Sequence, residues 1–205
     1  MNILQKTKIT LLLIATLVFS ACTMPKIGIS NLKEVKNDEI IVVGKIQLSP
    51  RISKDEIIFE NIITMGNSED LHRSMYMTIS EKYYDVETKN IYDFTDTVMA
   101  LDGDYFYFTW DKNKPMHFLG TTFITRWAQR NRESMTFTIN KGLEVKHSKK
   151  AKAIYIGSIT FERDEFFNIK NINTSQKGYK KAIQAFRKKF NTSMKIEKAK
   201  LSSSR

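Results

Sequence analysis

The chain has 205 residues, of which 41% are hydrophobic and 27% charged, and its formal net charge is +11 at pH 7. This composition argues against a disordered chain, because apolar side chains are plentiful while glycine and proline are scarce. The single cysteine excludes an internal disulfide, so the chain has to fold on a hydrophobic core alone, which its length allows.

The start of the chain has the pattern of a secretion signal. Lys6 and Lys8 provide positive charge, an apolar run follows from Ile9 to Phe19, and two small residues precede the only cysteine, Cys22. The apolar run is shorter than the roughly 20 residues that a membrane-spanning helix needs. We therefore expect residues 1–21 to be a signal peptide.

The segment Phe19-Ser20-Ala21-Cys22 resembles the lipobox of bacterial lipoproteins, with Phe19 where that family usually has leucine. The resemblance implies that the Cys22 thiol receives a diacylglyceryl group, that the chain is cleaved before Cys22, and that the new amino terminus is acylated, as with palmitate. Two or more acyl chains give stable attachment, so Cys22 would anchor the protein without a transmembrane helix. An ordinary secretory signal with a chance thiol is the alternative.

Thr23 follows the cysteine, at the position where inner-membrane lipoproteins of Gram-negative bacteria have aspartate. The resemblance therefore implies the outer membrane if the host is Gram-negative, and otherwise the outer face of the plasma membrane. Without the signal peptide, the net charge is still +9. Such a basic surface attracts anionic lipid, acidic glycan or nucleic acid, and export argues against nucleic acid. A lysine-rich composition inherited from an AT-rich genome is the alternative explanation.

Residues 22–38 are polar, contain Pro25 and Gly28, and show no sustained periodicity, which predicts a tether between the lipid and the domain. An extra edge strand that uses Ile27, Ile29 and Leu32 is the alternative.

Short apolar stretches between turn residues predict about eight or nine strands in the domain. In the strongest one, Tyr105 to Trp110, the residues Phe106, Phe108 and Trp110 share one face. The other expected strands are Ile40–Leu48, Glu56–Met65, Met75–Ile79, Tyr83–Val86, Met116–Thr125, Ser134–Asn140, Ala153–Phe161 and Phe166–Ile172. Trp127–Arg132 suits either a helical turn or a basic loop.

The periodicity changes near the end of the chain. From Ser175 to Phe190 apolar residues recur at spacings of three and four, which predicts one amphipathic helix. Since helices between the strands are missing, a doubly wound α/β sheet is excluded. We predict a mainly β domain over residues 39–191, an antiparallel β-sandwich or partly open barrel with one C-terminal amphipathic helix, and a fraying polar tail over residues 192–205.

Three of the expected strands contain a glycine after a large apolar residue, namely Gly44, Gly120 and Gly157. Glycine weakens a strand, so it indicates a bulge, a bend or the close approach of a backbone or ring. We expect each glycine to leave room for a ring across the sheet, and a ligand groove is the alternative. Over roughly residues 40–165, this pattern is similar to prealbumin-like β-sandwich lipoproteins of the bacterial envelope, which implies the fold alone.

Motifs for catalysis or metal binding are missing. His72, His117 and His147 do not have the spacing of metal ligands, and Ser158 lacks the second glycine of a nucleophile elbow. Asp102-Gly103-Asp104 would suit a carboxylate pair or calcium ligands, but a solvated turn is the simpler interpretation. We therefore expect no catalytic residue, no metal and no cofactor.

Two groups of side chains are candidates for binding. Tyr105 and Tyr107 would stack on a sugar, a peptide or a partner if they face solvent. In the second group, guanidinium groups near an indole would bind carboxylate, phosphate or acidic glycan, unless they form a solvated basic loop. This group comprises Arg126, Trp127, Arg130 and Arg132. The terminal helix would either lie on an anionic membrane or pack its apolar side on the sheet.

These patterns favour a lipid-anchored protein of the bacterial cell envelope that acts by binding or scaffolding, with an envelope protein or an acidic glycan as partner. The alternatives are a hydrolase or glycan-processing enzyme with a site assembled from distant residues, and a carrier of a lipid or small apolar ligand. If the protein is an enzyme, we expect a polar cleft where acids or a histidine converge. If it is a carrier, we expect a closed apolar cavity.

Overall fold

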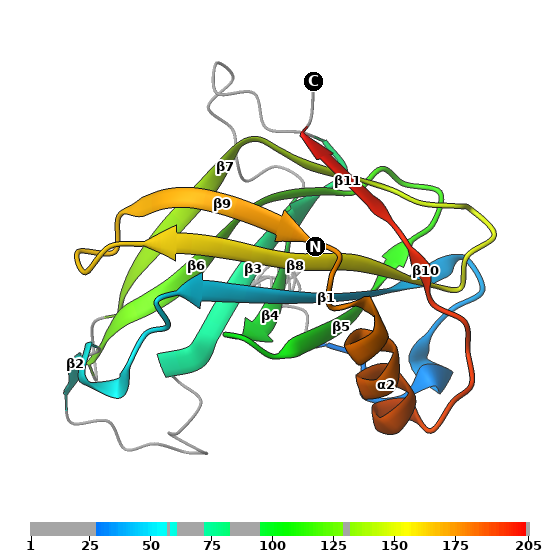
Figure 1. Ribbon diagram of the computed structural model, residues 1–205, viewed down its shortest axis with the longest axis horizontal. Helices are drawn as coiled ribbons and strands as arrows, with labels where there is room; N and C mark the ends of the chain where they lie inside the picture. Colours follow the sequence, from blue (N-terminus) through cyan, green and yellow to red (C-terminus); the bar gives the residue numbers. More distant parts are fainter. Residues whose placement is uncertain (1–27, 57, 61–71, 83–94, 129–131, 204–205) are drawn as a thin grey trace, which may run out of the picture.

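The structure is a computed structural model that describes residues 28–203 except 57, 61–71, 83–94 and 129–131. Two β-sheets face each other, and one α-helix lies on the outer side of one of them (Figure 1). The first sheet has the strand order β10-β8-β1-β5, with β9 also paired to β8. The second has the order β11-β7-β6-β3-β4, with β2 also paired to β6. The predicted β-sandwich with one C-terminal helix is confirmed.

The strands differ widely in length. The first sheet consists of β1 (Glu39–Ser49), β5 (Tyr105–Asp111), β8 (Ala153–Arg163), β9 (Ile169–Ser175) and β10 (Glu197–Lys198). The second consists of β2 (Ile58–Glu60), β3 (Ser74–Ser80), β4 (Thr95–Leu101), β6 (His117–Ala128), β7 (Arg132–Lys146) and β11 (Lys200–Ser203). The helices of the described residues are the short 3₁₀ turns η1 (Leu32–Glu34) and η2 (Lys54–Glu56) and the α-helix α2 (Tyr179–Phe190).

Most of the long strands lie within a few residues of their expected places, but β7 continues to Lys146, six residues beyond its expected end at Asn140. Three further differences stand out. The strand Thr95–Leu101 was not predicted, and β9 begins at Ile169 instead of Phe166, because a turn occupies the preceding residues. Trp127 belongs to β6, not to a helical turn or loop, since β6 and β7 stay paired up to Trp127 and Arg132. The expected strand Tyr83–Val86 and most of Glu56–Met65 lie outside the described residues.

The first sheet is mixed and not wholly antiparallel, because β1 runs parallel to β8 and antiparallel to β5. The first half of β1 is buried on both faces. Ile40 and Val42 point into the core between the sheets, whereas Ile41 and Val43 belong to a second core beneath α2. A strand covered on both sides needs apolar residues at consecutive positions, which explains the unbroken run at the start of β1.

The helix α2 packs its apolar side on the first sheet, as the periodicity allowed. Ala182 and Phe186 are buried against Tyr107 and Tyr155 of the sheet. Burial of such a stripe is what stabilises a short helix in a protein. The helix begins only at Tyr179, later than expected, because a turn precedes it in which the Tyr179 amide donates to the Gln176 carbonyl oxygen.

The described end of the expected tether is part of the domain. The Ile29 amide donates to the Tyr107 carbonyl oxygen at 2.9 Å, and the Ile29 side chain is buried in the second core. Leu32 and Val35 pack on the same core. The apolar residues in this polar segment therefore cover the outer face of the first sheet. Of the expected tether, only the residues before Gly28 are left to connect Cys22 with the domain.

The C-terminal tail is also folded, in contrast to the expected fraying. Ile196 and Ala199 are buried, and the tail carries β10 and β11. Since β10 pairs with β8 and β11 pairs with β7, this short segment passes from the first sheet to the second. It thereby joins the two layers at one side of the sandwich (Figure 1).

A buried arginine holds the ends of β1 and β8 together. The Arg163 guanidinium donates to the carbonyl oxygens of Pro50, Arg51 and Asp164. It also contacts both carboxylate oxygens of Glu56 at 2.8 and 2.9 Å. A planar guanidinium can satisfy so many acceptors at once, which lets this charge remain inside the fold.

Two kinds of close contact explain the three strand glycines. At Gly44 the expectation is confirmed, because a Cβ there would lie 2.4 Å from an atom of the Phe106 ring. At Gly120 and Gly157 the close neighbour is instead a backbone, namely the carbonyl oxygens of Phe137 and Ser175. Gly157 also has a φ of +98°, a backbone conformation that strongly favours glycine.

We predict that Gly44→Ala lowers the free energy of unfolding by about 1–3 kcal/mol, because the added methyl group overpacks the site against the Phe106 ring. Phe106→Leu costs stability on its own, but it should relieve this clash. A double-mutant cycle measured by urea unfolding should therefore show a coupling of at least about 0.5 kcal/mol. Strict additivity of the two changes would contradict this packing.

Candidate functional site

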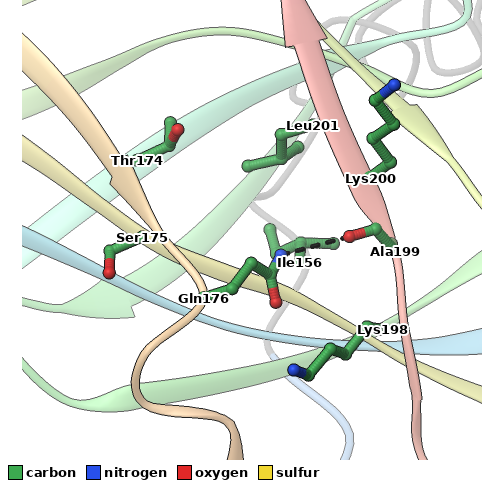
Figure 2. A pocket seen from close by; sticks show the side chains of 8 residues that line it. All are labelled: Ile156, Thr174, Ser175, Gln176, Lys198, Ala199, Lys200 and Leu201. Atoms are coloured by element: carbon green, nitrogen blue, oxygen red, sulfur yellow. Dashed lines mark hydrogen bonds between the residues drawn. The ribbon is translucent and has the colours of Figure 1, made fainter.

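The described residues form a hollow of about 340 Å³ between the end of β9 and the segment that joins β10 to β11 (Figure 2). We call it the edge slot. Its apolar lining consists of Ile156, Ala199 and Leu201. Its polar lining consists of Thr174, Ser175, Gln176, Lys198 and Lys200. Most of the polar residues are exposed, so the slot opens at the surface.

The slot exists because two strands share one edge of β8. The strand β9 pairs with β8 from Ser158 onward, whereas β10 pairs with Ile154 and Tyr155. Ile156 and Gly157 lie between the two, where the register of β8 against β1 shifts by one residue. The bulge and the positive φ of Gly157 therefore separate β9 from β10 and leave the gap.

Gln176 is the polar centre of the edge slot. Its Nε2 donates to the Ala199 carbonyl oxygen at 3.1 Å, which draws the side chain across the gap (Figure 2). Its Oε1 is buried and accepts no hydrogen bond from the described residues. A buried acceptor without a donor costs about 1–3 kcal/mol, so this oxygen suits a donor from a bound molecule.

A second buried polar atom without a partner lies close to Gly178, in the turn between β9 and α2. Tyr155 is fully buried, and its hydroxyl has no hydrogen-bond partner among the described residues. A Cβ on Gly178 would lie 2.9 Å from this hydroxyl and 3.7 Å from that of Tyr105. Burial raises the pKa of Tyr105, and the neighbouring Tyr155 adds to the shift. This phenol is therefore protonated at neutral pH.

Tyr107 does not face solvent, which corrects its place among the candidate binding residues. It is 5% exposed, and its ring contacts Phe186 and Phe190 of α2. Burial raises its pKa to about 12. Tyr105 on the same face is half-buried at the edge of the second core beneath α2. On the other face, Phe106, Phe108 and Trp110 form part of the core between the sheets, as expected.

The arginine cluster is described only in its backbone. Arg126 and Trp127 belong to β6 and Arg132 to β7, and the register places Trp127 opposite Arg132. The side chains of these residues, and the whole of Arg130, lie outside what the structure describes. Their binding role stays a prediction.

Asp102 does not lie in a solvated turn, in contrast to the simpler expectation. It is buried, and its Oδ1 accepts a hydrogen bond from the Leu48 amide at 2.9 Å. Burial raises its pKa in spite of this bond and of the positive charges of Arg51, Arg73 and Lys45. Asp104 is exposed and pairs with Arg73 at 2.7 Å. Both carboxylates thus take part in contacts that hold the turn in place.

The histidines lie in different surroundings. His117 is buried in β6 opposite Glu144, and burial lowers its pKa although Glu144 opposes the shift. His147 contacts the Ser148 carbonyl oxygen, and His72 is half-buried before β3. In the described part of the chain, no three His, Cys, Asp or Glu side chains gather as ligands of a metal ion would.

Comparisons with known proteins add no relative. No family model matches the sequence, and neither a curated protein nor a solved structure matches it. Within the described ranges, no helix combines the length and the apolar character needed to cross a bilayer.

We expect Asp102→Asn to keep the bond from the Leu48 amide and to remove a buried charge, whereas Asp102→Ala should lower the free energy of unfolding by about 1–3 kcal/mol. The pKa of Asp102 is raised by folding, so its contribution to stability is present below the unfolded pKa and is lost as the pH rises through the folded pKa. The stability of Asp102→Asn relative to wild type should therefore increase from pH 3 toward pH 7. Urea unfolding between pH 3 and pH 7 measures this difference in the free energy of unfolding. A difference that does not change with pH would contradict the raised pKa of Asp102.

Proposed function

We propose that this chain is a lipid-anchored protein of the bacterial cell envelope, held by Cys22, whose sandwich domain acts by binding and not by catalysis. The lipobox-like segment Phe19-Ser20-Ala21-Cys22 supports the anchor. The edge slot supports the binding role, because it combines an open hollow with the unpartnered Oε1 of Gln176.

One observation favours binding over hydrolysis. The lining of the edge slot contains the hydroxyls of Thr174 and Ser175 but no aspartate, glutamate or histidine that would act as the general base to activate them. Asp102, the best candidate acid of the sequence, is instead bonded to the backbone of β1.

The lining also supports a proposal for the class of ligand. Ile156, Ala199 and Leu201 would contact an apolar group, and Gln176 Oε1 would accept one hydrogen bond. A volume of about 340 Å³ is at the lower end of the range for ligand pockets. The slot therefore suits a small apolar ligand with one donor group, or the tip of a larger partner molecule.

Cys22→Ser should abolish the anchor. In the native host or a bacterial expression host, wild-type protein should incorporate labelled palmitate and remain with the membrane fraction, whereas the variant should do neither. Intact-mass analysis of the wild type should show cleavage before Cys22 together with the mass of the added acyl groups. Retention of residues 1–21, or an unmodified Cys22, would contradict the proposal.

Thr174→Trp should block the slot, because Thr174 is an exposed lining residue and the larger ring would extend into the hollow. Native mass spectrometry of protein purified from its host should show a bound small molecule on wild type and at least about tenfold less on the variant. Asn173→Trp is the matched control, since Asn173 is exposed on the same strand but does not line the slot. Equal retention by all three proteins would place the ligand elsewhere.

A further inference from the structure

The helix α2 carries a strong and unbalanced positive charge. Its twelve residues contain five lysine or arginine side chains and no acidic residue. All five are exposed: Lys180, Lys181, Arg187, Lys188 and Lys189. Acidic residues are missing from the whole stretch between Glu165 and Glu197. With its apolar side packed on the first sheet, α2 turns Lys180, Lys181, Arg187 and Lys188 outward. The Lys189 ammonium instead lies over the Tyr107 ring of that sheet.

Helix stability accounts for only three of these five charges. Arg187, Lys188 and Lys189 lie in the last turn, where positive charge favours the helix dipole. Lys180 and Lys181 lie in the first turn, where positive charge is unfavourable and an acidic residue would be preferred. The first-turn lysines thus work against local stability, so the helix dipole does not explain their presence.

The basic side of α2 is also little neutralised from within. Among the ion pairs that the described residues form, none includes a side chain of α2. Lys189 lies over the Tyr107 ring at 4.8 Å, a contact that leaves its charge uncompensated. Glu34, on the segment that packs on the same core as α2, accepts a hydrogen bond from Ser30 and takes part in none of these ion pairs.

The start of the described chain lies next to this helix. A Cβ on Gly28 would lie 2.5 Å from the Tyr107 carbonyl oxygen, and Ile29 donates to the same oxygen. The Tyr107 ring in turn contacts Phe190 of α2, with 5.3 Å between ring centroids. The first described residues accordingly run beside α2 in Figure 1.

The tether between anchor and domain is short. Six residue steps separate Cys22 from Gly28, and a fully extended chain spans at most about 3.3–3.6 Å per residue, or about 20 Å in total. This is close to the length of α2 itself, about 18 Å at 1.5 Å per residue. An acylated Cys22 would therefore keep the domain at the membrane surface. The side of the domain that carries α2 would lie nearest to the attachment point.

We propose that the basic side of α2 rests on an anionic phospholipid bilayer and orients the anchored domain. This inference depends on the proposed lipid anchor, and it adds the surface that contacts the membrane. Basic side chains are attracted to an anionic bilayer within a Debye length, about 8–10 Å, a separation that the short tether permits.

The test uses the mature lipidated protein in vesicles of phosphatidylcholine, with or without phosphatidylglycerol. A single free cysteine is introduced by Gln184→Cys on α2, or by Ser134→Cys on the second sheet, both at exposed positions, and carries a fluorophore. Quenching by spin-labelled lipid should be at least about twofold stronger at position 184 than at 134 in anionic vesicles, and high salt should remove the difference.

Charge variants test whether α2 causes this orientation. Lys180→Glu with Lys181→Glu should abolish the difference in quenching, whereas Lys149→Glu with Lys150→Glu, an equal change in net charge at exposed positions outside α2, should preserve it. Equal quenching at positions 184 and 134 in protein that floats with the vesicles would overturn the inference and leave the anchor intact. Failure of wild-type protein to float with neutral vesicles would instead overturn the anchor.

Discussion

The parallel pairing of β1 with β8 is the constraint on which the rest of the structure depends. It joins residues 41–49 to residues 153–162, more than a hundred positions apart, in the middle of the first sheet. Both cores form on this pair, because its side chains point alternately into the sandwich and toward α2. Arg163 closes one end of the pair by satisfying carbonyl oxygens of the chain that leaves β1. Loss of this pairing would therefore disrupt both cores at once.

The edge slot follows from the same pairing. The bulge at Gly157 is the point where β8 shifts its register against β1, and it is also where β9 and β10 separate. A side chain at position 157 would be strained by the positive φ and would approach the Ser175 carbonyl oxygen to 2.7 Å. The glycine that adjusts the centre of the sheet therefore also creates the hollow at its edge, which links the packing of the fold to its candidate binding site.

The sequence predicted the elements that have a local pattern. The alternation from Tyr105 to Trp110 identified both faces of β5, and the apolar spacing identified α2. The tail was missed because β10 and β11 are short and polar, and only their partners β8 and β7 make them strands. The edge slot was missed with it, since half of its lining comes from that tail. The consecutive apolar residues of Ile40–Val43 and Ala153–Ile156 were a usable signal, because burial on both faces is typical of parallel strands.

The two ends of α2 connect the proposed anchor with the proposed binding site. Near its C-terminal end, Phe190 contacts Tyr107, against which the chain that leads back to Cys22 is packed. At the other end, α2 begins three residues after Gln176, whose side-chain amide is the polar centre of the slot. A helix of about 18 Å spans the distance between these ends. If its basic side lies along an anionic bilayer, the end of α2 that adjoins the slot lies close to the lipid surface. A ligand or partner would then reach the slot at the membrane surface. The orientation of the anchored domain on the bilayer would therefore affect binding to the slot.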